Sequence, residues 1–144
     1  MSVAVPCKGI RVDTIALYPS SEQIQTLLTG PADEPVAMLN LLRFKPTGDA
    51  PDDDVSGEAA YRRYARPMIE FVTSKGARVI WSGRVASQVI GTGGEGFHMV
   101  ALVEYPSRAT FLQIANDPHV QEIGLHRAAG LEGQWLIAAT PEVP

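Results

Sequence analysis

The stretch "PVAMLNLLRFK", residues 35–45, constrains the fold more than any other part of this sequence. Apolar side chains occupy both the even and the odd positions of this segment. The even positions include Met38, Leu42 and Phe44, and the odd positions include Ala37, Leu39 and Leu41. A run this short, opened by Pro35 and bounded by helix breakers, predicts a strand rather than a core helix. Because side chains alternate between the two faces of a sheet, both faces of this strand need apolar cover. We therefore predict a central strand.

The patterns after this strand alternate between helix and strand. One amphipathic helix is predicted over 56–76, with Ser56 as its N-cap. Its apolar stripe has helical spacing and consists of Tyr61, Tyr64, Ala65, Met68 and Val72. We also expect strands at 77–91, 97–105 and 134–140. A helical segment is expected at 106–133, with Ser107 as its cap and a restart capped by Asp117. The order βαββαβ indicates a ferredoxin-like α+β fold, an antiparallel sheet with helices on one face.

Two further segments complete the predicted organisation. Ser20 and Gln23 form the capping box of a short helix that ends at Gly30 and Pro31, so we expect an N-terminal extension over 1–34 and one domain over 35–144. Residues 46–57 contain two prolines, two glycines and four aspartates, which predict a polar surface loop that could act as a lid.

Gly91, Gly93 and Gly96 spell the G-x-G-x-x-G motif of dinucleotide-binding loops. That motif binds a pyrophosphate where it opens a helix, because the free N–H groups of the first helical turn then point at the phosphates. The residues that follow, "FHMVALVEY", are rich in β-branched and aromatic types and predict a strand instead. We therefore interpret the glycines as hairpin-loop residues that adopt positive φ angles.

The helices of such a fold cover one face of the sheet and leave the other face bare in a single chain. The second apolar set of strand 35–45 would then be exposed to water. An exposed apolar face of this size usually marks an interface, and two such sheets packed face to face bury both. We therefore predict a homodimer.

The overall composition argues against several other classes of protein. The net charge of −4 gives no basic face for a nucleic-acid partner. The sequence contains no run of 18 apolar residues, so we expect no transmembrane helix. The first residues do not resemble a signal peptide. Cys7 is the only cysteine, which excludes an internal disulfide and favours a cytoplasmic protein. We interpret Cys7 as having no catalytic role.

Four segments resemble the domain of unknown function family numbered 1330, in the dimeric α+β barrel superfamily: "AMLNLLRFKP", "GEAAYRRYARPM", "FHMVALVEYPS" and "DPHVQEIGLHRAAGLEGQWLIAAT". The resemblance covers roughly residues 35–140 and rests on patterns that carry the fold. It implies a barrel made by the sheets of two protomers and a pocket between the sheet and helices of each. Members of the superfamily include small monooxygenases, lactone isomerases, haem-degrading enzymes and proteins without known activity, so the fold alone does not select a function.

Asn40 and His98 are the candidate catalytic residues. Asn40 interrupts the apolar central strand, and a buried amide without partners would cost about 1–3 kcal/mol. It either pairs with neighbouring groups or aims a hydrogen bond into a pocket. His98 opens the strand after the glycine loop and could act as a general base, or it is a rim residue bonded to water.

Arg127, Arg43, Tyr64 and Trp81 are the candidate ligand-binding residues. Each arginine could clamp a carboxylate, and Arg127 is the stronger candidate because its helix also carries inward apolar residues. Tyr64 and Trp81 could line an aromatic pocket, although core packing explains the tyrosines equally well. Strand 77–91 alternates so that Trp81 shares one face with the other odd-numbered residues, Val79, Gly83 and Val85.

Two sets of residues could hold a metal or a haem. His119, Glu122 and His126 fall on one helix face with ligand chemistry, but a metal normally takes ligands from a second element as well. The resemblance to haem-degrading proteins, which use a first-strand Asn, a Trp and a helix His, would involve Asn40 and His119. Trp81 lies on the second predicted strand rather than the third. We expect no metal and no obligatory cofactor.

These observations support two hypotheses. The first is a small-molecule enzyme of the cofactor-independent monooxygenase or isomerase type, in which Asn40 and Arg127 orient an anionic or carbonyl substrate and His98 moves a proton. The second is a non-catalytic binding or stress-related dimeric module. They are distinguished by whether Asn40, Tyr64, Trp81, His98 and Arg127 converge on one cavity.

Overall fold

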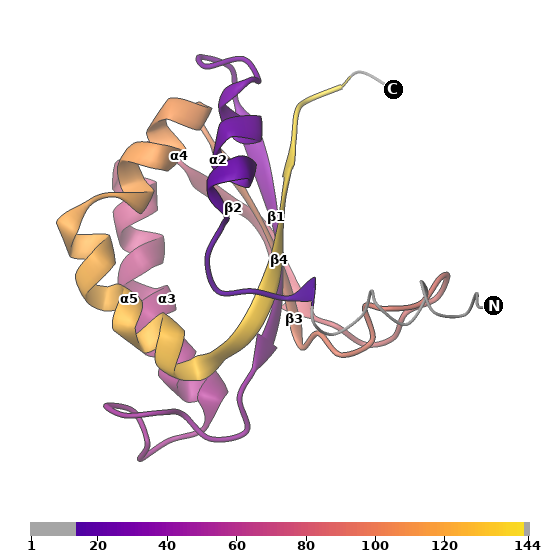
Figure 1. The fold of residues 1–144 in the computed structure, drawn as a ribbon, viewed down its shortest axis with the longest axis vertical. Coiled ribbons are helices and arrows are strands. Elements are labelled where there is room, and N and C mark those ends of the chain that lie inside the picture. The colour runs from indigo at the N-terminus through magenta and orange to yellow at the C-terminus, as the bar shows by residue number, and fades with distance from the viewer. Residues whose placement is uncertain (1–13, 143–144) are drawn as a thin grey trace.

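Four antiparallel strands form a single sheet in the computed structural model, which describes residues 14–142 (Figure 1). The strands are β1 (Val36–Phe44), β2 (Arg78–Arg84), β3 (Met99–Tyr105) and β4 (Leu131–Ala139). Their order across the sheet is β2-β3-β1-β4. The prediction that residues 35–45 form a central strand is confirmed, since β1 pairs with β3 along one edge and β4 along the other.

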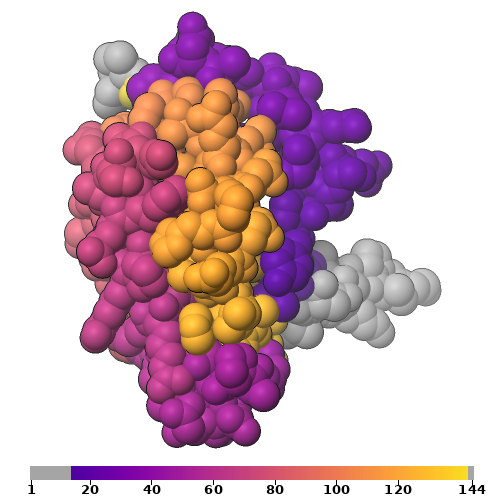
Figure 2. Space-filling view, turned by 90° about the vertical axis from the view of Figure 1, so that its left-hand side faces the viewer, coloured from indigo at the N-terminus to yellow at the C-terminus, as the bar shows by residue number. Residues whose placement is uncertain are grey.

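Three helices lie against one face of this sheet: α3 (Gly57–Ser74), α4 (Arg108–Ala115) and α5 (Pro118–Gly130). The side chains of Ser56, Ser107 and Asp117 accept hydrogen bonds from the first turns of these helices, which confirms the predicted N-caps. Viewed from the helical side, α3 and α5 run next to each other, below α4 (Figure 2). This is the ferredoxin-like α+β fold predicted from the order of elements. Among the described residues, no helix is both long and apolar enough to span a bilayer.

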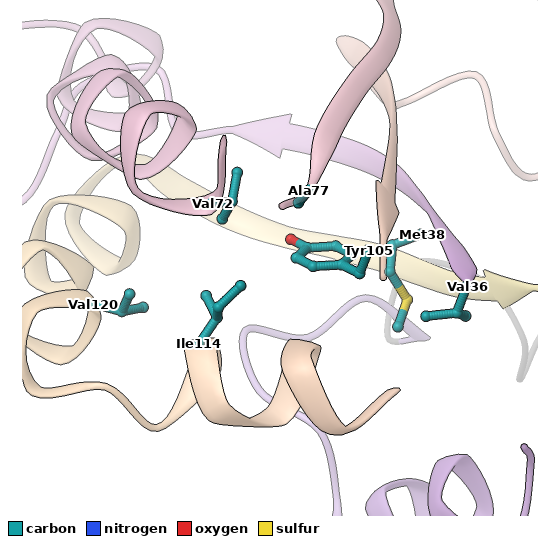
Figure 3. Close-up of a cluster of buried hydrophobic side chains, with 7 residues drawn as sticks. All are labelled: Val36, Met38, Val72, Ala77, Tyr105, Ile114 and Val120. Atoms are coloured by element: carbon teal, nitrogen blue, oxygen red, sulfur yellow. The ribbon is translucent and has the colours of Figure 1, made fainter. Parts of the chain in front are cut away.

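The hydrophobic core lies between the sheet and these helices. Figure 3 shows Val36 and Met38 from β1 and Tyr105 from β3 facing Val72 of α3 and Ile114 of α4. A smaller cluster of Leu42, Phe44 and Leu131 continues the core toward the other end of the sheet. The members of the predicted α3 stripe are all buried or half-buried, whereas Arg62, Arg63 and Arg66 are exposed.

The predicted alternation of strand β2 is wrong at one position. Val79 lies opposite Val103, but Trp81 lies opposite Leu102, so Ile80 is an extra residue that forms a bulge. An extra residue reverses the facing of every side chain beyond it. Val79 therefore faces the helices, while Trp81 and Gly83 face the opposite side. Strand β2 also ends at Arg84, seven residues before the predicted end, and β4 begins three residues earlier than predicted.

The loop between β2 and β3 contains the three glycines of the nucleotide-like motif. Gly91 and Gly93 have φ angles of +84° and +107°, conformations that favour glycine. A strand follows the loop rather than a helix. The predicted hairpin is thus confirmed, although Gly96 is not in the positive-φ region.

Several residues between 14 and 31 pack against the sheet and the helices. Helix α2 (Ser21–Leu28) begins with the predicted capping box, in which Ser20 and Gln23 exchange backbone–side chain hydrogen bonds. Ala16 forms an isolated bridge with Gln134 at the outer edge of β4. Arg108 of α4 donates to the carbonyl of Pro31 at 3.0 Å and holds the segment that follows α2. Cys7 lies outside the described residues.

The second face of the sheet carries no helix within residues 14–142 (Figure 1). We call it the outer face. It presents Leu39 and Leu41 of β1 with their partners on β3 and β4, among them Leu102 and Ile137. Trp81 is 60 % exposed and Ile137 is 47 % exposed on this face. The apolar outer face predicted from strand 35–45 is therefore present.

Candidate functional site

A chain of polar side chains crosses the layer between the sheet and the helices. Asn40 points to the same side of β1 as Met38 and Leu42, toward the helices. Its Nδ2 donates to the carbonyls of Met38 and Ala101 at 3.3 and 3.4 Å, and its Oδ1 accepts from Gln134 Nε2 at 3.3 Å. Both ends of the amide therefore have protein partners.

Arg127, in the last turn of α5, continues this chain. Its Nη2 donates to Gln134 Oε1 at 2.8 Å and to the carbonyl of Leu17 at 2.5 Å. Its guanidinium lies 5.4 Å from the centre of the Tyr18 ring. No carboxylate in the described part of the chain pairs with Arg127, so this half-buried cation has only neutral partners there. A cation in such surroundings favours an anionic or strongly dipolar ligand.

Tyrosine side chains lie beside this cation. The rings of Tyr61 and Tyr64, one turn apart on α3, are 5.5 Å from each other. Burial raises the pKa of Tyr64, and the nearby charge of Arg127 opposes the rise. Burial also raises the pKa of Tyr61 and of Tyr105 well above the ordinary value. The phenols therefore stay protonated at neutral pH and can donate hydrogen bonds to an anion.

His98 is separated from this group by Phe44, whose ring lies 5.4 Å from the ring of Tyr61. Its ring stacks on Phe44 at 5.6 Å, and its Nδ1 accepts a hydrogen bond from the Phe44 backbone N–H at 2.9 Å. It lines a shallow hollow with Lys45, Ser56 and Glu58 at the start of α3. The Nδ1 lone pair is thus already used by the backbone, and the ring holds the end of β3 against β1.

Trp81 and Arg43 are on the outer face, on the other side of the sheet from Asn40. Trp81 packs over Gly83 of its own strand. Arg43 forms a salt bridge with Glu132 through Nε at 2.8 Å. Of the five residues expected to converge, the structure brings together Asn40, Tyr64 and Arg127 and places Trp81 and His98 elsewhere.

The candidate metal and haem residues do not come together. His119 is exposed and contacts the ring of Phe71, while Glu122 is exposed on the same helix. His126 instead bonds to Asp52, with 2.6 Å between Nδ1 and Oδ2. Among residues 14–142, no group of three His, Cys, Asp or Glu side chains could hold a metal ion. Trp81 lies on the outer face, on the other side of the sheet from Asn40, so these two residues of the haem pattern do not face one site.

Two polar features of the interior were not predicted. Gln134 is hydrogen-bonded to both Asn40 and Arg127. The only sequence signal for it was its position as a polar residue at the start of the last predicted strand. Asp52, in the loop predicted to lie at the surface, is 1 % exposed. It accepts from Arg63 Nη1 at 2.5 Å as well as from His126, so the loop is fixed to α3 and α5.

The fold defines the class to which this chain belongs, the ferredoxin-like α+β proteins. The family described as "Domain of unknown function (DUF1330)" matches residues 52–140, and the chain belongs to that family. The chain is 32 % identical to a protein of unknown function from Rhodopseudomonas palustris, with a TM-score of 0.81, over 91 % of this chain and 100 % of that one. No curated protein sequence matches it.

More distant solved structures share the fold alone. A dimeric protein of unknown function with a ferredoxin-like fold, from Bacteroides fragilis, is 16 % identical with a TM-score of 0.50 and covers 77 % of this chain and 100 % of its own. SnoaB, a cofactor-independent oxygenase from Streptomyces nogalater, is 9 % identical with a TM-score of 0.51 and covers 77 % of this chain and 96 % of its own.

Proposed function

We propose that this protein binds a small anionic or carbonyl compound between the sheet and the helices, with Arg127 as the charged contact. The observation that carries the proposal is the half-buried guanidinium of Arg127, which has no carboxylate partner among the described residues. Its Nη2 donates to Leu17 and Gln134, which orients the group, and within residues 14–142 no hydrogen bond occupies Nε or Nη1. An arginine held in this way can bind a carboxylate with two parallel hydrogen bonds.

The surrounding side chains suit such a ligand. The protonated phenols of Tyr61 and Tyr64 can donate to a second oxygen atom, and their rings supply an apolar wall. Gln134 donates a side-chain hydrogen bond to Asn40 and accepts one from Arg127, which fixes the position of Arg127. A mostly apolar lining with a few converging donors is typical of small-molecule sites.

Catalysis without a cofactor, of the monooxygenase or isomerase type, is the second candidate. The donors that would bind an anion would also stabilise an oxyanion or enolate formed from a carbonyl compound. The similarity to SnoaB, a cofactor-independent oxygenase, is consistent with this chemistry. However, Asn40, Gln134, Arg127 and the protonated tyrosines include no general base. The Phe44 ring separates His98 from the tyrosines, and His98 Nδ1 already accepts from the Phe44 backbone. Binding therefore has the stronger support.

The proposal includes a cytoplasmic homodimer in which two outer faces pack together. The exposed side chains of Trp81 and Ile137 and the apolar strand β1 on that face support it. The dimeric ferredoxin-like protein from Bacteroides fragilis offers a parallel. The division into an extension over 1–34 and a domain over 35–144 stays a prediction, as does a function limited to stress-related binding.

The test uses benzoate as the probe and benzamide as its uncharged counterpart, with binding measured by NMR chemical-shift titration. We expect benzoate to bind more tightly than benzamide, and Arg127→Gln to weaken benzoate binding at least about tenfold, because a charged hydrogen bond is lost. Arg66→Gln, an exposed arginine on α3, is the matched control and should change nothing. Equal affinities for wild type and Arg127→Gln, with both variants folded by circular dichroism, would contradict the proposal.

A further inference from the structure

The loop between β2 and β3 forms a projecting arm. The Val85 N–H donates to the His98 carbonyl at 2.9 Å, which closes the base of the loop directly beyond the two strands. We call residues 86–96 the arm. Figure 1 shows it extending away from the helices, beyond the opposite side of the sheet.

Contacts at the base of the arm fix the face on which it stands. Phe97 is 5 % exposed, and its ring meets the ring of Trp135 edge to face at 4.9 Å. Trp135 pairs with Leu41, so it belongs to the outer face. The Arg43 side chain, on the same face, lies 3.2 Å from where a Cβ on Gly96 would stand. The arm therefore stands on the outer face, which is the face that we assign to the dimer.

Hydrogen bonds give the arm a defined shape. The Gln88 side chain accepts from Gly94 N at 2.7 Å and donates to the Ile90 carbonyl at 3.1 Å. Gly93 N donates to the Glu95 carboxylate at 2.6 Å. This crossbraced turn presents the residues between its ends as a fixed tip.

The tip carries two large apolar side chains that touch little of their own chain. Val89 is 86 % exposed and Ile90 is 89 % exposed, more than any other large apolar side chain in the described ranges. Exposed apolar residues scattered singly need no explanation, but an adjacent pair on a shaped projection beside an apolar face does.

We propose that the arm of each protomer contacts a second copy of this chain and buries Val89 and Ile90 against it. The inference rests on the proposed face-to-face dimer and deepens it. Packed sheets lie only about 10 Å apart, so a projection that stands on the shared face must run alongside the partner. A two-fold axis then makes both arms contribute equally, and the four tip side chains lose water together.

Sedimentation velocity over a dilution series tests the inference with three variants. Val89→Ser combined with Ile90→Ser should raise the dimer dissociation constant about 100-fold or more. The reason is that each of the two protomers loses the apolar area that its tip buries in the dimer. Ile137→Arg, on the outer face itself, should also give monomers. Leu125→Ser, at a leucine on the helical side that is 47 % exposed like Ile137, should leave the dissociation constant unchanged.

A photo-crosslinker at position 90 identifies what the tip touches. Benzoylphenylalanine in place of Ile90, in an exchanged mixture of ¹⁴N and ¹⁵N chains, should give crosslinked peptide pairs of mixed isotope. The arm contact would be overturned, and the dimer retained, by three results together. The wild type is a dimer, the tip variant has the same dissociation constant, and crosslinks form only within one chain. A wild-type monomer would overturn the dimer and the arm contact together.

Discussion

Replacing Asp52 with asparagine removes one charge from a group of three ionisable side chains and changes almost no volume. Asp52 holds the β1–α3 loop by accepting from Arg63 and His126, and its side chain is 2 % exposed. The two donors belong to α3 and α5, so the carboxylate connects three segments. The variant would leave both donors facing a neutral amide.

The expected loss of stability follows from the surroundings of the two donors. Removing one partner of a fully buried ion pair costs about 3–5 kcal/mol, because the other charge remains without compensation. Here the side chains of Arg63 and His126 are 41 % and 29 % exposed, so water can solvate what Asp52 leaves. We therefore expect a loss of about 2 kcal/mol, or about 4–8 °C in melting temperature for a chain of this size.

The pH dependence provides a second check on the same residue. Burial alone would raise the pKa of Asp52, but the hydrogen bonds from His126 and Arg63 hold the pKa below its ordinary value. A carboxylate with a lowered folded-state pKa stabilises the fold above the unfolded-state pKa of about 3.9 and loses that effect as the pH falls through the folded-state value. The difference between wild type and variant should be complete near pH 5 and should shrink below about pH 4.

Urea denaturation followed by circular dichroism measures both quantities. Asp54→Asn is the matched control, because Asp54 also bonds to Arg63 but its side chain is 63 % exposed, and it should change stability little. Equal stability of wild type and Asp52→Asn at pH 5, or a difference that grows on acidification, would refute the reasoning.

Three further predictions concern packing and titration. Gly130→Ala should destabilise the fold by more than about 3 kcal/mol in urea denaturation, because the new Cβ would lie 2.2 Å from a carbonyl oxygen of α3. Gly124→Ala is the control in the same helix. Its new Cβ meets open space, so this variant should stabilise the fold by about 0.5–1 kcal/mol. Arg108→Leu should speed amide exchange in α2 and leave β1 protected, whereas unchanged α2 exchange would disprove the anchoring role. The buried phenols of Tyr61 and Tyr105 should ionise only above pH 10 in an ultraviolet titration, and complete ionisation by pH 10 would contradict their burial.

Most of the fold was predictable because the patterns that define it are local. Apolar residues at both even and odd positions of 35–45 identified the central strand. The caps Ser56, Ser107 and Asp117 marked the helix starts. The bulge at Ile80 was not predictable, because an extra residue in one strand becomes visible only against its partner strand. The result was a wrong side for Trp81.

The candidate site was predictable only in part, for a similar reason. Asn40 and Arg127 stand out as polar residues in apolar surroundings, and both lie on inward faces. Their connection through Gln134 depends on the pairing of β1 with β4. The burial of Asp52 depends on donors from α3 and α5, and no pattern within its own acidic loop distinguishes it from the neighbouring aspartates.

The position of β1 in the sheet has a consequence for synthesis on the ribosome. Strand β1 is made first, but both of its hydrogen-bonded neighbours, β3 and β4, come later in the chain. The second edge of β1 stays unpaired until β4 emerges about 90 residues later, which takes roughly 5–20 s at common elongation rates. During that interval, a mostly apolar strand offers a free edge to any other chain. A nascent chain that stalls before residue 131 is thus a natural client for a chaperone that recognises extended apolar segments.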